Sequence, residues 1–285
     1  MTLRYSTVSF LSDYGLSDEF AGVVKSVIRS IAPDVAVVDI THDIAPHDVR
    51  AGGLALARSA QYLAAGVVLA VVDPGVGGNR RAVAVEVGDG SSVLVGPDNG
   101  LLAPAAAMVG GASRAVELTA ERFHLPSAGP TFAGRDVFAP VAAHLCLGAD
   151  FAALGRLIPT HSLTPGVVPV SRADGESIHA EVLWIDRFGN VQLNLDPDEI
   201  APWGDAVRLT AGDIGRNARR VNSFGDLSSG ELGVLVDSYG LVTIAVNRGS
   251  AALELGCGEA DPIAVAACGP APATPVKLQA KRSDE

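Results

Sequence analysis

Charged residues are scarce in this chain, and basic residues are the scarcer kind. Charged side chains make up 19% of the 285 residues, below the usual quarter. Acidic residues outnumber basic ones by 32 to 21, which gives a formal net charge of −11. A nucleic-acid binder needs a basic surface to neutralise phosphates, so we expect no nucleic-acid partner.

Cysteines and long apolar runs are also few. Cys146, Cys257 and Cys268 lie far apart without a CxxC pair, so neither a disulfide framework nor a zinc knuckle is expected. The longest apolar runs, such as 66–72, fall well short of the ~20 residues that span a bilayer. Asp13 comes too early for a secretion signal. The sequence therefore predicts a cytoplasmic protein that does not contact a membrane.

Several catalytic motifs are missing. There is no GxGxxG, no GxxxxGK[ST] and no GxSxG, which argues against common nucleotide-binding loops and a serine hydrolase. Asp13, His42, Asp43 and Asp73 have side chains that can ligate a metal. No compact spacing groups them, so we expect no metal.

Hydrophobic residues are abundant, at 48% of the chain. Apolar runs at 8–11, 35–40 and 67–72 are typical of buried strands. The periodicity between them predicts a helix over 17–31, with Ser17 as its N-cap, and a second helix over 48–63. Continuous apolar strands that alternate with helices indicate an α/β domain with a mostly parallel sheet covered on both faces.

The pattern of predicted helices and strands changes after this region. A hairpin is predicted over 82–95, and helices are predicted over 99–109 and 136–147. After residue 178, short strands at close spacing dominate and indicate an all-β barrel or sandwich. The predicted organisation is an α/β domain at 1–165, a linker at 166–177, an all-β domain at 178–268 and a mobile tail at 269–285.

Polar residues gather where the predicted N-terminal strands end. Ligands of open α/β sheets bind outside the carboxyl ends of the strands, so these residues are candidates for a site. The alternative is that each carboxylate only caps a helix or a turn. The residues are Asp13, Asp39, His42, Asp73, Asp98 and Asn99.

Seven sequence blocks follow one another from residue 12 to residue 252. They are SDYGLSDEF, VVDITHDIAPHDV, VVDPGVGGNRRAVAV, GPDNGLL, TFAGRDVFAP, IDRFGNVQLN and DSYGLVTIAVNRGSAA. In this order they resemble the S-adenosyl-L-methionine (SAM) hydroxide adenosyltransferase family, also called SAM hydrolases, whose halide-using relatives are the fluorinases and chlorinases.

The resemblance implies an N-terminal α/β domain, a C-terminal β-barrel and a homotrimer whose sites lie between neighbouring subunits. It also implies hydrolysis of SAM to adenosine and L-methionine by attack of water or hydroxide at C5′, with no cofactor or metal. Two alternatives stay open: a halide adenosyltransferase, and a module that binds SAM or adenosine without turnover.

The resemblance also assigns roles to residues of the N-terminal half. Asp13 matches a carboxylate that binds the ribose hydroxyls, Asp73 the position beside C5′, and Arg80 a catalytic arginine. Arg81 is expected to face solvent. Ala133 stands where the family carries a catalytic histidine, which predicts slowed turnover.

Further matches lie in the predicted barrel, where the residues are expected to contact adenosine and the methionine end of the substrate. Ordinary turn formation is the alternative for each of them. They are Asp186, Phe188, Asn190, Ser238, Tyr239, Val246 and Arg248.

Overall fold

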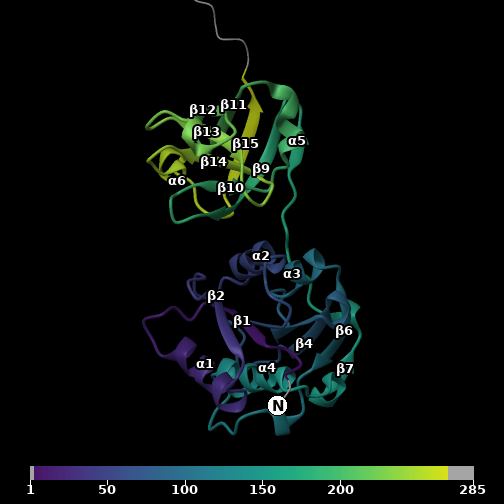
Figure 1. Ribbon diagram of the computed structural model, residues 1–285. Coiled ribbons are helices and arrows are strands. Elements are labelled where there is room, and N and C mark those ends of the chain that lie inside the picture. Colours follow the sequence, from purple (N-terminus) through teal and green to yellow (C-terminus); the bar gives the residue numbers. More distant parts are fainter. Residues whose placement is uncertain (1–2, 269–285) are drawn as a thin grey trace, which may run out of the picture. The chain divides into compact units, whose positions relative to one another are not determined.

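The computed structural model describes residues 3–268 as two compact units (Figure 1). The first unit ends at Val168 and the second begins at Pro169. This boundary falls within the range 166–177 that the sequence predicts as a linker, although strand β8 (Arg172–Asp174) also lies in that range. The tail predicted over 269–285 lies outside the described residues.

A seven-stranded sheet forms the centre of the first unit. Its order is β2-β1-β3-β5-β4-β6-β7; the strands β2, β1, β3 and β5 are parallel, and β4, β6 and β7 extend the sheet with antiparallel pairs. The strands are β1 (Thr7–Ser12), β2 (Ala36–Thr41), β3 (Val67–Val71), β4 (Ala82–Val87), β5 (Ser92–Pro97), β6 (Ala112–Glu117) and β7 (Arg156–Ile158).

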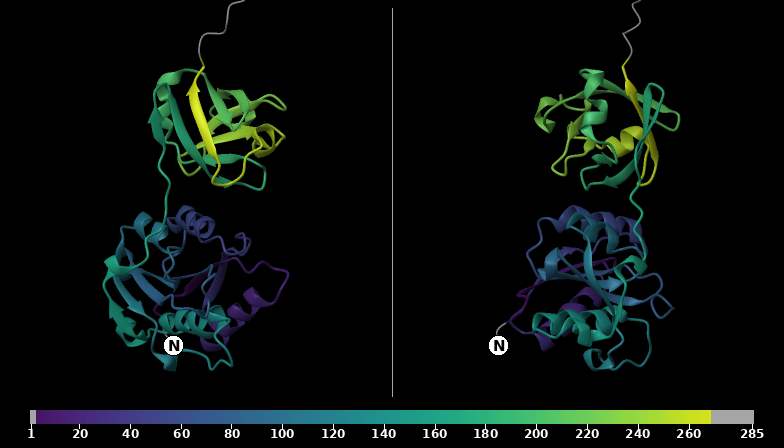
Figure 2. Two further views of the ribbon diagram at one scale, coloured as in Figure 1. Left: turned by 180° about the vertical axis from the view of Figure 1, so that it is seen from behind. Right: turned by 90° about the vertical axis from the view of Figure 1, so that its right-hand side faces the viewer.

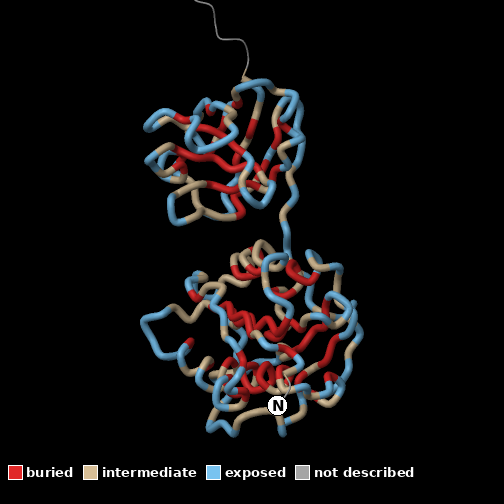
Figure 3. Tube along the Cα trace, in the orientation of Figure 1, coloured by how far each residue is buried: buried red, intermediate tan, exposed pale blue. Residues whose placement is uncertain are grey.

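Helices cover both faces of this sheet (Figure 1). Helices α1 (Phe20–Ile31) and α4 (Ala139–Cys146) pack together on one face, and α2 (Val49–Ala60) and α3 (Ala103–Met108) on the other. The central strand β3 is buried along its whole length, and Figure 3 shows this buried interior in red. The prediction of an α/β domain with a layer of helices on each face is confirmed.

Two predicted helix starts are wrong. Helix α1 begins at Phe20 rather than Ser17, and no side chain caps it, because residues 17–19 belong to a bend beside the site described below. The helix predicted from Asn99 begins only at Ala103, since the Asn99 side chain accepts a hydrogen bond from the Leu101 backbone within a turn.

The second unit is a β-barrel. Its sheet runs β10-β14-β13-β12-β11-β15-β9-β8, and the additional pairing of β10 with β9 closes it, with β8 outside the closure. Figure 2 shows the strands curling round, so the barrel prediction is confirmed. The remaining elements are β9 (Ser177–Ile185), β10 (Val191–Leu193), α5 (Pro197–Ile200), β11 (Ala206–Ala211), β12 (Ile214–Arg220), β13 (Leu232–Val236), β14 (Val242–Val246), α6 (Ala251–Leu255) and β15 (Pro262–Ala267).

In the described part of the chain, every helix is too short or too polar to cross a membrane.

Candidate active site

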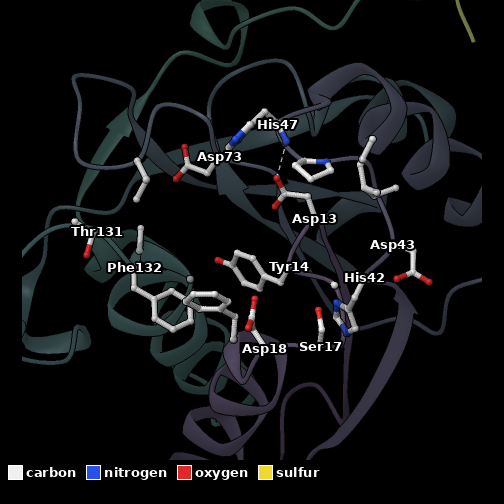
Figure 4. Close-up of a pocket in the computed structure, with 18 residues that line it drawn as sticks. Asp13, Tyr14, Ser17, Asp18, His42, Asp43, His47, Asp73, Thr131 and Phe132 are labelled. Atoms are coloured by element: carbon white, nitrogen blue, oxygen red, sulfur yellow. Dashed lines mark hydrogen bonds between the residues drawn. The ribbon is translucent and has the colours of Figure 1, made fainter.

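A cavity of about 650 Å³ opens at the carboxyl ends of β1, β2 and β3 (Figure 4). This is the position at which parallel α/β sheets bind ligands. Segments far apart in the sequence meet there: the loop after β1, the loop after β2, Asp73 after β3, and the turn before α4. The side chains that matter below are Asp13, Tyr14, His42, His47, Asp73, Phe132 and Ala133.

Asp73 is held by Arg80 through two parallel hydrogen bonds. Arg80 Nε donates to Asp73 Oδ1 at 2.8 Å and Arg80 Nη2 donates to Asp73 Oδ2 at 2.5 Å. The Asp73 side chain is 6% exposed and the Arg80 side chain 17%. Such a bidentate pair fixes the plane of the carboxylate. Oδ1 accepts one hydrogen bond from Arg80, whereas Oδ2 accepts two, so Oδ1 keeps a further lone pair for a molecule in the cavity.

The Asp13 carboxylate is fixed by the backbone of the loop after β2. The His47 N–H donates to Asp13 Oδ2 at 2.9 Å, the contact drawn as a dashed line in Figure 4. His47 has φ of 71°, a left-handed conformation that is uncommon outside glycine and aims its N–H at the carboxylate. Asp13 therefore keeps further acceptor sites on its carboxylate, in the lining of the cavity.

Aromatic rings surround Tyr14 at the floor of the cavity. Its ring centroid lies 5.7 Å from that of Phe20 and 5.7 Å from that of Phe132. Burial, and then the nearby carboxylates of Asp13 and Asp73, raise the pKa of the Tyr14 hydroxyl well above its usual value. The hydroxyl is therefore protonated whenever the protein is folded near neutral pH.

A chain of polar contacts, which runs from buried Ser12 and His42 to exposed Asp39, supports the loop that carries Asp13. Ser12 Oγ lies 2.7 Å from His42 Nδ1, and Asp39 Oδ1 lies 3.1 Å from His42 Nε2. Burial opposes ionisation of Asp39, but its hydrogen bonds with Lys25 and His42 outweigh this and lower its pKa. His42 is only 4% exposed, so its buried imidazole stabilises the end of β1 through the contact with Ser12.

Ala133 lies in the wall shared by two cavities. It lines the cavity of Asp13 and Asp73, and it also lines a second cavity of about 750 Å³ that includes Arg80, His124 and Asp136. The residue precedes a π-helical turn at Gly134–Phe138, a feature found often at functional sites. The sequence predicted ordinary helix from Asp136 onwards, whereas α-helix begins only at Ala139.

Four of the predicted barrel residues meet in a cavity of about 400 Å³ in the second unit: Asp186, Asn190, Ser238 and Tyr239. The sequence reasoning missed the polar neighbours beneath them. Asp237 accepts hydrogen bonds from the side chains of Gln192, at 2.5 Å, and Thr243, at 2.9 Å. The DSYG block was the available signal, because its first residue is this aspartate.

The other barrel candidates lie elsewhere. Phe188 is 77% exposed and Val246 is buried in β14, and neither they nor Arg248 line this cavity. Asp186 bonds within its own turn, where it accepts from the backbone N–H groups of Phe188 and Asn190, both at 2.9 Å. Turn formation thus accounts for the contacts of Asp186 that the structure contains.

Asp98 and Asn99, the candidates at the end of β5, bond to neighbouring segments and do not line the cavity. Arg81 was expected to face solvent, and that is wrong: its Nε donates to Asp98 at 2.8 Å, and its Nη1 donates to Ser162 at 3.2 Å. Asn99 Nδ2 donates to the carbonyl of Val72. These contacts tie the segment around Ser162 to the sheet.

Sequence reasoning overlooked three residues of the main cavity: Tyr14, His47 and Phe132. Tyr14 and Phe132 flank predicted site residues in SDYG and TFAGRD, so adjacency was the available signal. His47 contributes through its backbone, which no residue pattern reveals. Among residues 3–268, no three His, Cys, Asp or Glu side chains are grouped so that they could hold a metal ion.

Comparison with known families identifies the class of protein that this fold and site define. The profile of the SAM hydroxide adenosyltransferase N-terminal domain matches residues 8–155, and that of the C-terminal domain matches residues 180–264. The chain belongs to the SAM hydroxide adenosyltransferase family.

Particular relatives are similar over nearly their whole length. A protein of Salinispora tropica named (R)-S-adenosyl-L-methionine hydrolase is 46% identical over 260 residues, covering 91% of this chain and 97% of the relative. A protein of the same name from Thermus thermophilus is 42% identical, covering 90% and 98%. A fluorinase of Actinopolyspora mzabensis is more distant, at 26% identity, covering 86% and 92%.

A solved structure has the same fold. The crystal structure of an uncharacterized conserved protein from Thermotoga maritima superposes with a TM-score of 0.83 at 35% identity, covering 91% of this chain and 99% of that one.

Proposed function

We propose that this protein hydrolyses SAM to adenosine and L-methionine by attack of water at C5′. The observation that carries the proposal is the Asp73 carboxylate, which Arg80 holds rigidly at the wall of the cavity that also presents Asp13. Relatives at 42–46% identity are named SAM hydrolases, which supports the same reaction here.

The chemistry needs little beyond a positioned water. The sulfonium of SAM is a good leaving group and requires no acid. The water oxygen bonds to C5′ as the C5′–S bond breaks, and the electron pair of that bond passes to sulfur, giving the thioether of methionine. Asp73 accepts the proton of the water and later releases it to solvent, a role of a positioned general base.

Asp13 is proposed to bind the substrate rather than to react. A carboxylate offers several acceptor sites, which suits the adjacent 2′ and 3′ hydroxyls of ribose. The expected result for Asp13→Asn is a higher KM with a smaller change in kcat. An unchanged KM would contradict this role.

A halide adenosyltransferase is the second candidate, because fluorinases are relatives. It is disfavoured because the Asp73 carboxylate at the reacting position would repel a halide ion. Chromatography of the protein with SAM, with and without fluoride or chloride, separates the candidates. Adenosine supports hydrolysis, a halogenated nucleoside supports halide transfer, and unchanged SAM indicates a binding module.

We also propose that no metal or cofactor takes part, since attack on a sulfonium needs no Lewis acid. Adenosine formation is expected to be unchanged after treatment with EDTA and dialysis. Loss of activity that a divalent metal restores would contradict this.

The site is further proposed to be completed by the barrel of a neighbouring subunit in a homotrimer. Asn190, Ser238 and Tyr239 share one cavity and would contact adenosine or the methionine end of SAM. For Asp186, Phe188, Val246 and Arg248 the same role rests on the family resemblance. Light scattering is expected to give a trimer, and a fully active 29.1 kDa monomer would contradict the proposal.

A mixing experiment tests the shared site directly. Asp73→Asn subunits lack the base, and Ser238→Ala subunits carry a weakened barrel. If the site spans two chains, unfolding and refolding the two variants together restores activity, because some sites then combine intact halves. Separately refolded variants serve as the control.

We place the protein in the cytoplasm. All three cysteines, Cys146, Cys257 and Cys268, are unpaired, as is usual in that reducing compartment. Cell fractionation tests this location.

A further inference from the structure

Tyr14 brings a hydroxyl group to the cavity that contains Asp73. The residue lines this cavity, and within residues 3–268 its hydroxyl has no hydrogen-bond partner and is not sealed from solvent. Figure 4 shows the hydroxyl pointing toward the segment that carries Thr131 and Phe132. A free phenol hydroxyl in this place is able to bond to a ligand or to water.

The ring of Tyr14 has a fixed position. Phe10 packs against it at a centroid distance of 6.4 Å, and Phe20 and Phe132 at 5.7 Å each. Gly134 permits the close approach, because a Cβ built on that glycine would overlap the Tyr14 hydroxyl oxygen. Packing of this kind gives a polar group the rigidity that a catalytic role requires.

Other polar side chains, such as His47 and Thr131, also line the cavity, but the Tyr14 hydroxyl is the one that adjoins the backbone next to Ala133. Ala133 and Gly134, which adjoin the hydroxyl, offer no side-chain donor or acceptor. The opposite polar group is the carboxylate of Asp73, whose negative charge, like the positive charge of Arg80, acts on the Tyr14 hydroxyl. Asp73 and Tyr14 thus line the same cavity.

We propose that the Tyr14 hydroxyl orients the attacking water beside Asp73, filling the role left open by Ala133. The proposal rests on the proposed function. Tyr14 holds the water by a hydrogen bond while the oxygen–C5′ bond forms, the C5′–S pair passes to sulfur and the proton passes to Asp73. Because burial and the two carboxylates raise its pKa, Tyr14 stays neutral and does not act as the base.

The test is Tyr14→Phe, which removes one oxygen atom and keeps the aromatic packing. We expect kcat for adenosine formation from SAM to fall about 10-fold, the kinetic equivalent of one hydrogen bond, with KM little changed. The matched control is Tyr5→Phe. The Tyr5 hydroxyl donates to the Gly90 carbonyl at 2.9 Å, away from the cavity, so kcat should stay the same.

Two further variants separate Tyr14 from other groups. If Ala133→His supplies an imidazole to the water, Tyr14→Phe in that background should lower kcat by less than it does alone. His124 lines the cavity on the other side of Ala133, and its buried Nε2 has no partner among the described residues. His124→Gln is expected to leave kcat unchanged.

The outcomes distinguish this inference from the proposed function. If the unmodified protein forms no adenosine from SAM, the proposed function fails, and the role of Tyr14 with it. If the unmodified protein is active and Tyr14→Phe keeps its kcat, only the role of Tyr14 fails. A loss of kcat in His124→Gln but not in Tyr14→Phe would assign the water to the other side of Ala133.

Discussion

The hydroxyl of Tyr14 lies directly over Gly134, so closely that a single methyl group at residue 134 would overlap it. Two segments more than a hundred residues apart thus meet with no space between them. The glycine is needed here for its missing side chain and not for an unusual backbone angle.

Gly134→Ala should therefore lower activity. Either the ring of Tyr14 or the π-helical turn must move, and overpacking of this kind typically costs about 1–3 kcal/mol of stability. Adenosine formation and the free energy of unfolding are measured together. Gly22→Ala is the matched control, because open space surrounds its Cβ position in α1. Equal activity in both variants would show that the contact has no functional weight.

Asp73→Asn should nearly abolish adenosine formation while SAM still binds. The amide keeps the shape of the side chain but cannot accept a proton, and loss of a general base costs roughly 10²- to 10⁴-fold in rate. Steady-state kinetics and calorimetric binding of SAM test this. Asp89→Asn serves as control, since Asp89 lies in the exposed hairpin turn between β4 and β5. Normal turnover in Asp73→Asn would refute the mechanism.

Ala133→His is expected to raise the rate of adenosine formation. The second cavity beside Ala133 has a volume of about 750 Å³, so the imidazole has room near Arg80. A positioned acid–base group contributes up to roughly 10²- to 10⁴-fold. A rate that falls or stays level would show that an imidazole at this position does no chemistry in this chain.

Stability should decrease as the pH falls below neutral, in part because of His144. Burial lowers the pKa of its imidazole, and its ring packs on Phe123 with centroids 5.2 Å apart. The unfolded chain therefore binds a proton more readily, so the contribution of His144 is present above its ordinary pKa of about 6.5 and is lost as the pH drops through the lower folded value.

Urea unfolding at several pH values between 5 and 8 tests this dependence. His144→Gln should flatten the pH dependence of the unfolding free energy, whereas His161→Gln, in an exposed 3₁₀ turn, should not. An identical slope in His144→Gln and the unmodified protein would contradict the prediction.

The fold was largely predictable because its strands are strongly patterned. Continuous apolar runs such as 67–71 identify buried parallel strands. Short strands at close spacing predicted a barrel or a sandwich after residue 178, and the family resemblance of the seven blocks implied the barrel. Strands β6 and β7 were missed for the opposite reason. Most residues of the segment ASRAVE are partly or fully exposed, and β7 has only three residues, so pairing within the sheet rather than local pattern makes them strands.

The site was predictable only where a side chain carries the function. Asp13 and Asp73 follow apolar strands and were recognisable, and the structure places both in one cavity. The contact of the His47 backbone with Asp13 depends on a left-handed φ, and Arg81 has a partner in Asp98 that lies 17 residues away. Neither follows from residue type, because both depend on how loops meet in space.

Ala133 lines two cavities, and this determines how substitutions at this position are interpreted. Any side chain larger than that of Ala133 changes the volume of both cavities at once, so a substitution there has a steric effect as well as a chemical one. Ala133→Leu fills the same space without a titratable group and separates the two effects.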